Sequence, residues 1–484
     1  MITRVRDRYD VVVVGGGTAG AIAGIAAART GARTLILERQ GYLGGVLAFG
    51  MNFLGAVDAD GRWALGGIGR ELVERLRARG GATAAKMSPL FGSVLAQDPE
   101  ALKIELLRMA KEAGTDLLFH SIMVDTVVDA GRVTSLVIAN KSGLEVIPAT
   151  TIVDASGDAD VVASAGGGWV FGRPEDGQAQ PASRIFFVGG VQFERTFDYL
   201  AENPEDRQPP PGWRKPAPTL AEAEPATAPP LDHLRDTPGI TVEGFSAALA
   251  RAKAAGDLTI PRSYMGLYTY PGRSEIGVNL TRSHRVDATK PDDVTRAEVE
   301  TQLQMAEAVE FLRKYIPGFE QTYIVSAPHQ LGVRESRHIE ADYSLTERDV
   351  LSGASFEDQV ARGAYPLDIH DIGAGVVTGG RKVTGSGVCV MPIQKSFGIP
   401  MRSLIPAGLT NVVVAGRCIA ATHEAAGSVR GQAVCMVTGH AAGTIAALAS
   451  LDGVAVRELP YERVRARLDE QNAVVDEGEA LVVA

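Results

Sequence analysis

The chain has 484 residues, of which 45% are hydrophobic and 22% are charged, with 55 glycines and 3 cysteines. This length fits two or three domains with a large buried core, and the apolar content excludes a disordered or collagen-like protein. The formal net charge of −10 argues against non-specific nucleic-acid binding, which needs a basic surface. The high glycine content has to be explained by particular motifs.

Features of the sequence also bear on the compartment. The first eight residues are charged and carry no apolar run of the kind that a signal peptide requires, so we expect a cytoplasmic protein. The cysteines show no spacing typical of a metal or redox site, and no metal is expected. The apolar stretch 433–451 contains His440 and several hydroxyl side chains, which predicts a buried helix rather than a membrane span.

The first thirty residues contain a glycine-rich turn between a strand and a helix. The β-branched run 9–14 predicts a buried parallel strand, and an alanine-rich stretch that ends near residue 30 predicts a helix. Between them, Gly15 permits a tight turn, Gly17 lets a pyrophosphate approach the backbone, and Gly20 lets the helix pack closely. This order of strand, turn and helix predicts a dinucleotide site.

Two further features support a dinucleotide ligand. Thr18 and Ala19 stand at the helix N-terminus, where unpaired N–H groups and a partial positive charge favour phosphates. A second strand over 34–37 ends at Glu38, whose carboxylate can accept hydrogen bonds from a ribose diol. The charge of Glu38 disfavours a 2′-phosphate. A Rossmann-like unit that binds no ligand is the alternative.

These residues, followed by Arg39 and by Gly44 and Gly45, resemble the N-terminus of FAD-dependent oxidoreductases with the glutathione-reductase-type flavin fold. In that family an acid and a basic residue end the second strand, and the Gly-Gly loop lies against the cofactor. The resemblance implies FAD as cofactor and an α/β fold, in which a Rossmann-like FAD-binding domain has a parallel central sheet.

A later segment carries the same resemblance. Residues 151–158, Thr-Ile-Val-Asp-Ala-Ser-Gly-Asp, are similar to the family's D-A-T-G-D strand, which implies that Gly157 lies on the adenosine side of FAD. The stretches 116–128 and 133–139 before it predict strands. By analogy with the family, the backbone near Val124 meets the adenine.

The C-terminal part resembles the family's second cofactor segment. A strand over 409–415 closes on Gly416, and a helix follows from about residue 431, whose N-terminus would face the flavin pyrimidine ring. Arg417 stands where glutathione-reductase relatives carry an aspartate. Together with residues 332–337 and 365–370, this Ala-Gly-Arg-Cys form resembles a less-studied branch of FAD-dependent oxidoreductases.

The cofactor segments lie at both ends of the chain, so we expect the middle to be an insertion. It contains a hairpin over 264–280 and a proline-rich loop that we expect to be an exposed lid. The predicted division is an FAD-binding domain over 1–170 and 385–455, an α+β substrate or cap domain over 171–384 with the proline-rich loop 203–230, and a C-terminal helical tail over 456–484.

Two histidines are candidate catalytic bases. His423 follows the cofactor strand and could take a hydroxyl or amine proton as a hydride leaves the substrate, or instead hydrogen-bond to flavin or backbone. His370 lies near Asp368 and could be a base oriented by a carboxylate, or a solvated loop residue.

Three arginines are candidate anion-binding residues. Arg334 and Arg337 could bind a substrate carboxylate or a flavin carbonyl, or form structural ion pairs with nearby glutamates. Their spacing of three places them on one face of a helix but on opposite faces of a strand. Arg430 could reach a substrate anion or a cofactor phosphate.

The sequence therefore predicts an FAD-dependent dehydrogenase or oxidase that removes a hydride from a small organic substrate to flavin N5, preferably at a CH–OH or CH–NH centre. The alternatives are a flavin-dependent reductase of an unsaturated acid, a flavin monooxygenase, and a flavin-fold binding protein without turnover. The electron acceptor, O2 or a carrier protein, and homo-oligomerisation are left open. No nucleic-acid or membrane partner is expected.

Overall fold

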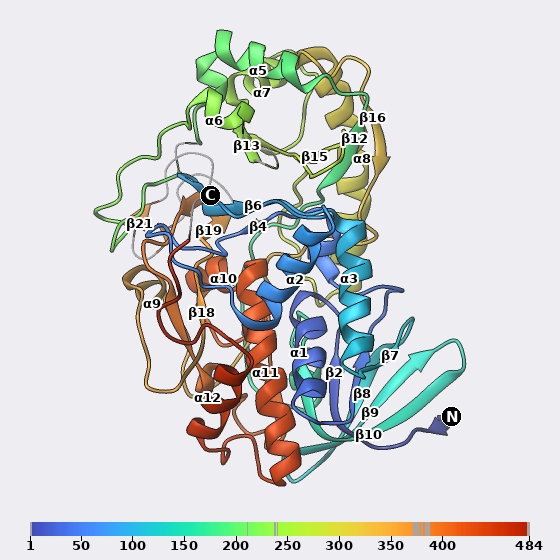
Figure 1. The fold of residues 1–484 in the computed structure, drawn as a ribbon. Coiled ribbons are helices and arrows are strands. Elements are labelled where there is room, and N and C mark those ends of the chain that lie inside the picture. The colour runs from blue at the N-terminus through green and yellow to red at the C-terminus, as the bar shows by residue number, and fades with distance from the viewer. Residues whose placement is uncertain are drawn as a thin grey trace.

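A mixed eight-stranded sheet forms the centre of the computed structural model, which describes residues 2–210, 212–236, 239, 241–370, 377–378, 381–382 and 388–481 (Figure 1). The long strand β10 (Gly143–Asp154) connects its two halves. The other strands are β1 (Ile2–Val5), β2 (Tyr9–Val14), β3 (Thr34–Leu37), β7 (Asp116–Leu118), β8 (Ile122–Asp129), β9 (Arg132–Asn140) and β24 (Val412–Val414).

The second half of β10 carries the parallel part of this sheet. It pairs in parallel with β2 on one side and with β24 on the other, and β3 and β7 extend the sheet beyond β2. The first half of β10 pairs antiparallel with β9, which pairs antiparallel with β8. The parallel strands confirm the Rossmann-like α/β prediction, and the sheet is mixed because β8 and β9 form a hairpin on β10.

Two helices that are distant in sequence cover this sheet together. Helix α1 (Thr18–Arg29) lies beside α11 (Gln432–Asp452) (Figure 1). A Cβ atom on Gly443 would lie 2.1 Å from the Ala23 carbonyl oxygen, so only glycine permits this approach. Within the described part of the chain, α11 is the one helix long and apolar enough to span a membrane, but 89% of its most apolar window is buried inside the protein. This agrees with the predicted buried helix.

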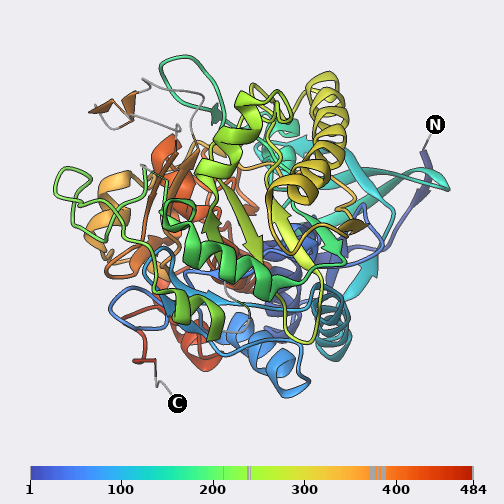
Figure 2. The same cartoon turned by 90° about the horizontal axis from the view of Figure 1, so that it is seen from above.

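A cap lies over the predicted FAD-binding part of the molecule (Figure 2). Its antiparallel sheet has the order β13 (Thr241–Gly244), β14 (Met265–Tyr268), β15 (Ile276–Asn279), β12 (Phe186–Gly189) and β16 (Tyr323–Ser326). Its helices are α5 (Phe193–Glu202), α6 (Leu231–Asp236), α7 (Ser246–Ala254) and α8 (Pro291–Tyr315). The cap has its own hydrophobic core, and the predicted hairpin is confirmed by the pairing of β14 with β15.

Smaller elements surround the two cores. The remaining helices are α2 (Gly67–Ala78), α3 (Pro99–Glu112), α4 (Asp160–Ser164), α9 (Glu347–Ser352), α10 (His423–Val429) and α12 (Tyr461–Glu470). In one small sheet, β6 (Gly92–Leu95) lies between β4 (Phe53–Leu54) and β5 (Lys86–Ser88). The other small sheets pair β11 (Trp169–Phe171) with β17 (Arg337–Ile339), β18 (Gln359–Gly363) with β23 (Phe397–Pro400), β19 (Leu367–His370) with β22 (Val388–Met391), and β20 (Val377–Thr378) with β21 (Arg381–Lys382).

Two parts of the predicted organisation differ from the structure. Leu345 and Val360 pack into the core of the predicted FAD-binding part, so the segment 339–370 contributes to that core rather than to the core of the cap. The predicted boundary at 384–385 lies outside the described residues. Trp213, in the proline-rich segment, is only 3% exposed and packs edge-on against Phe91 at 5.2 Å between ring centroids. This segment is therefore partly an interior wall, and burial of the large apolar ring of Trp213 favours that arrangement.

Candidate active site

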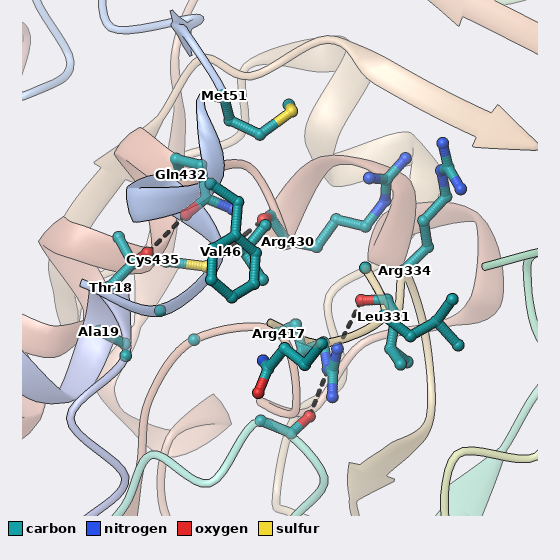
Figure 3. A pocket seen from close by; sticks show the side chains of 18 of the residues that line it. Thr18, Ala19, Val46, Met51, Leu331, Arg334, Arg417, Arg430, Gln432 and Cys435 are labelled. Carbon is teal, nitrogen blue, oxygen red and sulfur yellow. Dashed lines mark hydrogen bonds between the residues drawn. The ribbon is translucent and has the colours of Figure 1, made fainter. Parts of the chain in front are cut away.

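An elongated cavity runs along the junction between the FAD-binding part and the cap. Its sequence-predicted lining residues are Gly15, Gly17, Thr18, Ala19, Glu38, Arg39, Gly45, Gly157, Arg334, His370, Gly416, Arg417 and Arg430. Figure 3 shows part of this cavity, with Thr18, Ala19, Gln432 and Cys435 at one side and Arg334 and Arg430 at another. The lining brings together residues from both ends and the middle of the chain.

The glycine-rich turn after β2 forms a cradle at one wall. Gly15 has φ +95°, and a Cβ atom there would lie 2.5 Å from the Ala155 carbonyl oxygen. A Cβ atom on Gly20 would lie 1.8 Å from the Gly15 carbonyl oxygen, which explains why α1 can start so close to the turn. At Gly17 a Cβ atom would meet no protein atom within 4 Å, and this residue lines the cavity. The space beside Gly17 therefore fits a ligand that approaches the backbone.

Glu38 lies at the end of β3 and holds the loops around the turn. Its Oε2 accepts a hydrogen bond from the Gly16 N–H at 2.6 Å, and its Oε1 accepts one from the Gln40 N–H at 2.7 Å. Each carboxylate oxygen keeps a second acceptor site for a ribose hydroxyl. Arg39 is exposed at the rim, where its Nη2 donates to the Gln330 Oε1 at 2.7 Å.

Three predicted cofactor residues do not line the cavity. A Cβ atom on Gly20 would meet the Gly15 backbone. A Cβ atom on Gly44, which has φ +107°, would meet the Leu106 side chain on α3. Val124 on β8 is 49% exposed, and the cavity is lined instead by residues 121–123.

Arg417 connects the three segments that carried the later family resemblance. Its Nε donates to the Gly157 carbonyl oxygen at 2.5 Å, and its Nη1 donates to the Val333 carbonyl oxygen at 2.5 Å. Its Nη2 forms an ion pair with Asp158. All three guanidinium nitrogens thus bind protein groups, and Arg417 shapes the cavity wall by holding these loops together.

Two helix N-termini open into the cavity. Neither Gly17 before α1 nor Gly431 before α11 supplies a side-chain cap, so within the described part of the chain the first N–H groups of both helices are left for a ligand. Thr18 Oγ1 donates to Gln432 Oε1 at 2.6 Å and so joins the two helix starts. The N-terminus of α1 suits a pyrophosphate, and the N-terminus of α11 suits the negative charge that develops on a reduced flavin. These features fit FAD.

Two of the predicted catalytic residues are not among those that line the cavity. His423 begins α10, and its Nδ1 lies 2.9 Å from the Glu335 Oε1 in a buried pair. Burial raises the pKa of Glu335, but hydrogen bonds from His338 and His423 outweigh it and hold the pKa at about 2. Arg337 is not a lining residue, and its Nη1 bonds to the Asp160 Oδ1 at 3.1 Å.

His370 lines the cavity, but both of its ring nitrogens are engaged. Nε2 lies 2.8 Å from the Asp368 Oδ1, and Nδ1 lies 2.9 Å from the Arg282 Nη2. A guanidinium can only donate, so Nδ1 accepts and the ring is neutral. Burial holds the pKa of His370 well below its usual value. The predicted orienting carboxylate is present, yet the ring keeps no free nitrogen for a substrate proton.

Arg334 and Arg430 bring two guanidinium groups to the same end of the cavity (Figure 3). Arg430 Nη2 donates to the Asp368 Oδ2 at 2.9 Å, and Arg334 Nη1 donates to the Pro181 carbonyl oxygen at 2.7 Å. Burial and the nearby Arg430 lower the pKa of Arg334 to about 10, so it remains a cation at neutral pH.

Glu243 on β13 is a lining residue that the sequence did not indicate. It is 7% exposed, its Oε1 is 3.4 Å from the Tyr268 hydroxyl, and its Oε2 has no hydrogen-bond partner among the described residues. Burial raises the pKa of Glu243 to about 7. No motif or periodic pattern surrounds this residue in the sequence, and only the folding of the cap brings it to the cavity.

Comparison with known proteins identifies the family. The family model for FAD dependent oxidoreductases matches residues 10–468, which is nearly the whole chain. This protein belongs to that family. It is an FAD-dependent flavoenzyme, and the finer assignment to an Ala-Gly-Arg-Cys branch remains a prediction.

Several solved flavoenzyme structures are similar to this oxidoreductase at low sequence identity. A geranylgeranyl bacteriochlorophyll reductase-like protein from Thermoplasma acidophilum is 11% identical, with 97% of this chain and 85% of that chain covered and a TM-score of 0.44. p-Nitrophenol 4-monooxygenase from Pseudomonas putida is 11% identical, with 96% and 89% covered and a TM-score of 0.44. A myxobacterial chondrochloren halogenase is 12% identical, with 96% and 79% covered and a TM-score of 0.43.

Proposed function

We propose that this FAD-dependent oxidoreductase removes a hydride from a small organic substrate at a CH–OH or CH–NH centre. The observation that carries the proposal is Glu243, a buried carboxyl with an unpartnered oxygen in the same cavity as the glycine-rich turn. An oxidation of this kind needs a base, because the hydroxyl or amine loses its proton as the carbon loses its hydride. A carboxyl with a pKa of about 7 is about half ionised at neutral pH.

In this proposal the chain's own residues hold the cofactor and manage the proton. The turn at Gly15 and Gly17, the carboxylate of Glu38 and the N-terminus of α11 would hold FAD, which when bound supplies the acceptor for two electrons and one hydrogen. Glu243 takes the hydroxyl or amine proton while the C–H bond breaks and a C=O or C=N bond forms. Trp213 in the cavity wall helps to exclude water.

Anaerobic mixing of the holoenzyme with single alcohols and amines tests the proposal. At least one compound should bleach the flavin absorbance without NADH or NADPH, and Glu243→Gln should slow that bleaching about 100-fold. Glu243→Asp, which keeps the carboxyl, should recover part of the rate. Glu202→Gln, an exposed change on α5 of the same cap, is the matched control and should leave the rate unchanged.

Two outcomes would contradict the proposal. If only NADH or NADPH bleaches the flavin, the enzyme is a reductase or a monooxygenase. If Glu243→Gln bleaches at the wild-type rate with the active compound, Glu243 is not the base.

A further inference from the structure

Four guanidinium groups gather around the end of the cavity that contains Glu243. Arg334 and Arg430 line it, and Arg262 and Arg282 lie buried behind the wall. Among the described residues that line this end, the carboxyls are Asp368 and Glu243. Since burial keeps Glu243 partly protonated at neutral pH, the positive charge exceeds the negative charge here.

Asp368 cannot neutralise all four cations. Its Oδ1 is 2.8 Å from the His370 Nε2, and its Oδ2 accepts hydrogen bonds from the Tyr365 hydroxyl at 2.8 Å and from the Arg430 Nη2 at 2.9 Å. Within the described chain, the hydrogen bond of Arg334 is to a backbone carbonyl, that of Pro181. Arg334 therefore faces the cavity without a carboxylate of its own.

Several buried donors in this group lack partners. The Nε atoms of Arg262, Arg282 and Arg430 and the Nη2 of Arg262 have no hydrogen-bond partner in the described part of the chain. Burial and the nearby Arg262 lower the pKa of Arg282 to about 9, which shows that the guanidinium groups repel one another. A bound anion would relieve this repulsion and would be favoured in a region shielded from water.

We propose that the substrate carries a carboxylate, and that Arg334 and Arg430 bind this carboxylate at the end of the cavity next to Glu243. Two guanidinium groups suit a carboxylate because each presents a planar pair of donors to its two oxygens. The inference rests on the proposed function, since it names the class of molecule that is oxidised in the same cavity. Carboxylate binding can nevertheless be measured without turnover.

The test titrates the holoenzyme with acetate, succinate and benzoate, and with acetamide, succinamide and benzamide as uncharged counterparts. Inorganic phosphate is a further arm, because it shares the negative charge but not the planar shape. The readouts are the perturbation of the flavin spectrum and the shift in melting temperature. We expect at least one carboxylate to bind, with an affinity about ten-fold or more above its amide and above phosphate.

Variants of two arginines in the same segment assign the binding to the site. Arg334→Gln should weaken carboxylate binding about ten-fold or more, and Arg334→Lys, which keeps the charge but loses the planar pair of donors, should weaken it less. Arg337→Gln is the matched control, because Arg337 does not line the cavity and its guanidinium is bonded to Asp160 and to the Asp158 carbonyl oxygen. The FAD affinity of each variant is measured by reconstitution of its apoprotein.

Three results would overturn the inference. The first is equal binding of carboxylates and amides. The second is tighter binding of phosphate than of any carboxylate. The third is an Arg334→Gln variant that loses FAD affinity and not carboxylate affinity, since Arg334 would then be a cofactor residue. If carboxylates bind as expected but no compound bleaches the flavin, the inference stands and the proposed oxidation fails.

Discussion

Three glutamates show how local surroundings decide what one type of side chain does. Glu38 accepts two backbone N–H groups and holds the cofactor turn, whereas Glu335 lies between two histidines and stays ionised. Glu243 has a weak contact to Tyr268 and, among the described residues, no cation bonded to it, so burial dominates and its pKa rises to about 7. Of the three, Glu243 is the one suited to move a proton at neutral pH.

The pH dependence of flavin reduction follows from the raised pKa of Glu243. The base is active when ionised, so the rate with a substrate from the panel should be low below pH 6, rise through about pH 7, and level off above it. In Glu243→Gln the rise near pH 7 should disappear. Stopped-flow measurement of the anaerobic bleaching rate across this range provides the check, and a wild-type rate that falls with increasing pH would contradict the assignment.

At the residue scale, the sequence predicted those contacts that a residue makes with others nearby in the chain. Gly15, Gly17 and Glu38 lie where their motif predicts, because a strand, a turn and a helix suffice to place them. His423 was a reasonable candidate from its position, but its ring direction depends on Glu335, which is remote in sequence. The place of Glu243 depends on the whole cap sheet, and no local pattern reports it.

At the scale of elements, the contact between α1 and α11 explains part of the glycine surplus. Gly439 and Gly443 of α11 face the backbone of Ala19 and Ala23 of α1, and a Cβ atom on either glycine would lie 2.2 Å or less from a carbonyl oxygen. The close contact brings both helix N-termini to the same cavity. The glycines thus serve packing as well as cofactor approach.

A pair of substitutions separates these two uses of glycine. Gly443→Ala should destabilise the protein by about 1–3 kcal/mol, because the overpacking exceeds the gain in helix propensity. Gly17→Ala has room and a φ of −65°, so the apoprotein should keep its melting temperature while FAD affinity falls. Thermal unfolding and FAD titration of both variants give the answer. A Gly443→Ala variant as stable as the wild type would refute the packing argument.

The element predictions succeeded where a local pattern decided the structure. The hairpin of β14 and β15 lies close to its predicted range. The stretch 116–128 was predicted as a strand, but it forms β7 and β8 with a turn at His120, which has φ +51°. A single non-glycine residue with positive φ leaves little trace in sequence, which is why this break was not expected.

At the scale of the whole molecule, the cavity lies where two separately packed cores meet. The cap core and the FAD-binding core are distinct, and sites at such junctions take residues from both sides. The sequence predicted the insertion because the two cofactor segments bracket the chain. It did not predict that residues 339–370 pack with the FAD-binding part, since that packing depends on long-range contacts such as those of Leu345.

The mass change of the substrate in a single anaerobic turnover tests the central claim most directly. Mass spectrometry of the mixture of holoenzyme and the bleaching compound should show a product that has lost two hydrogen atoms, because a hydride and a proton leave together. A substrate that stays intact without O2 and gains one oxygen atom when NADPH and O2 are supplied would contradict the account. A product that gains two hydrogen atoms would contradict it equally.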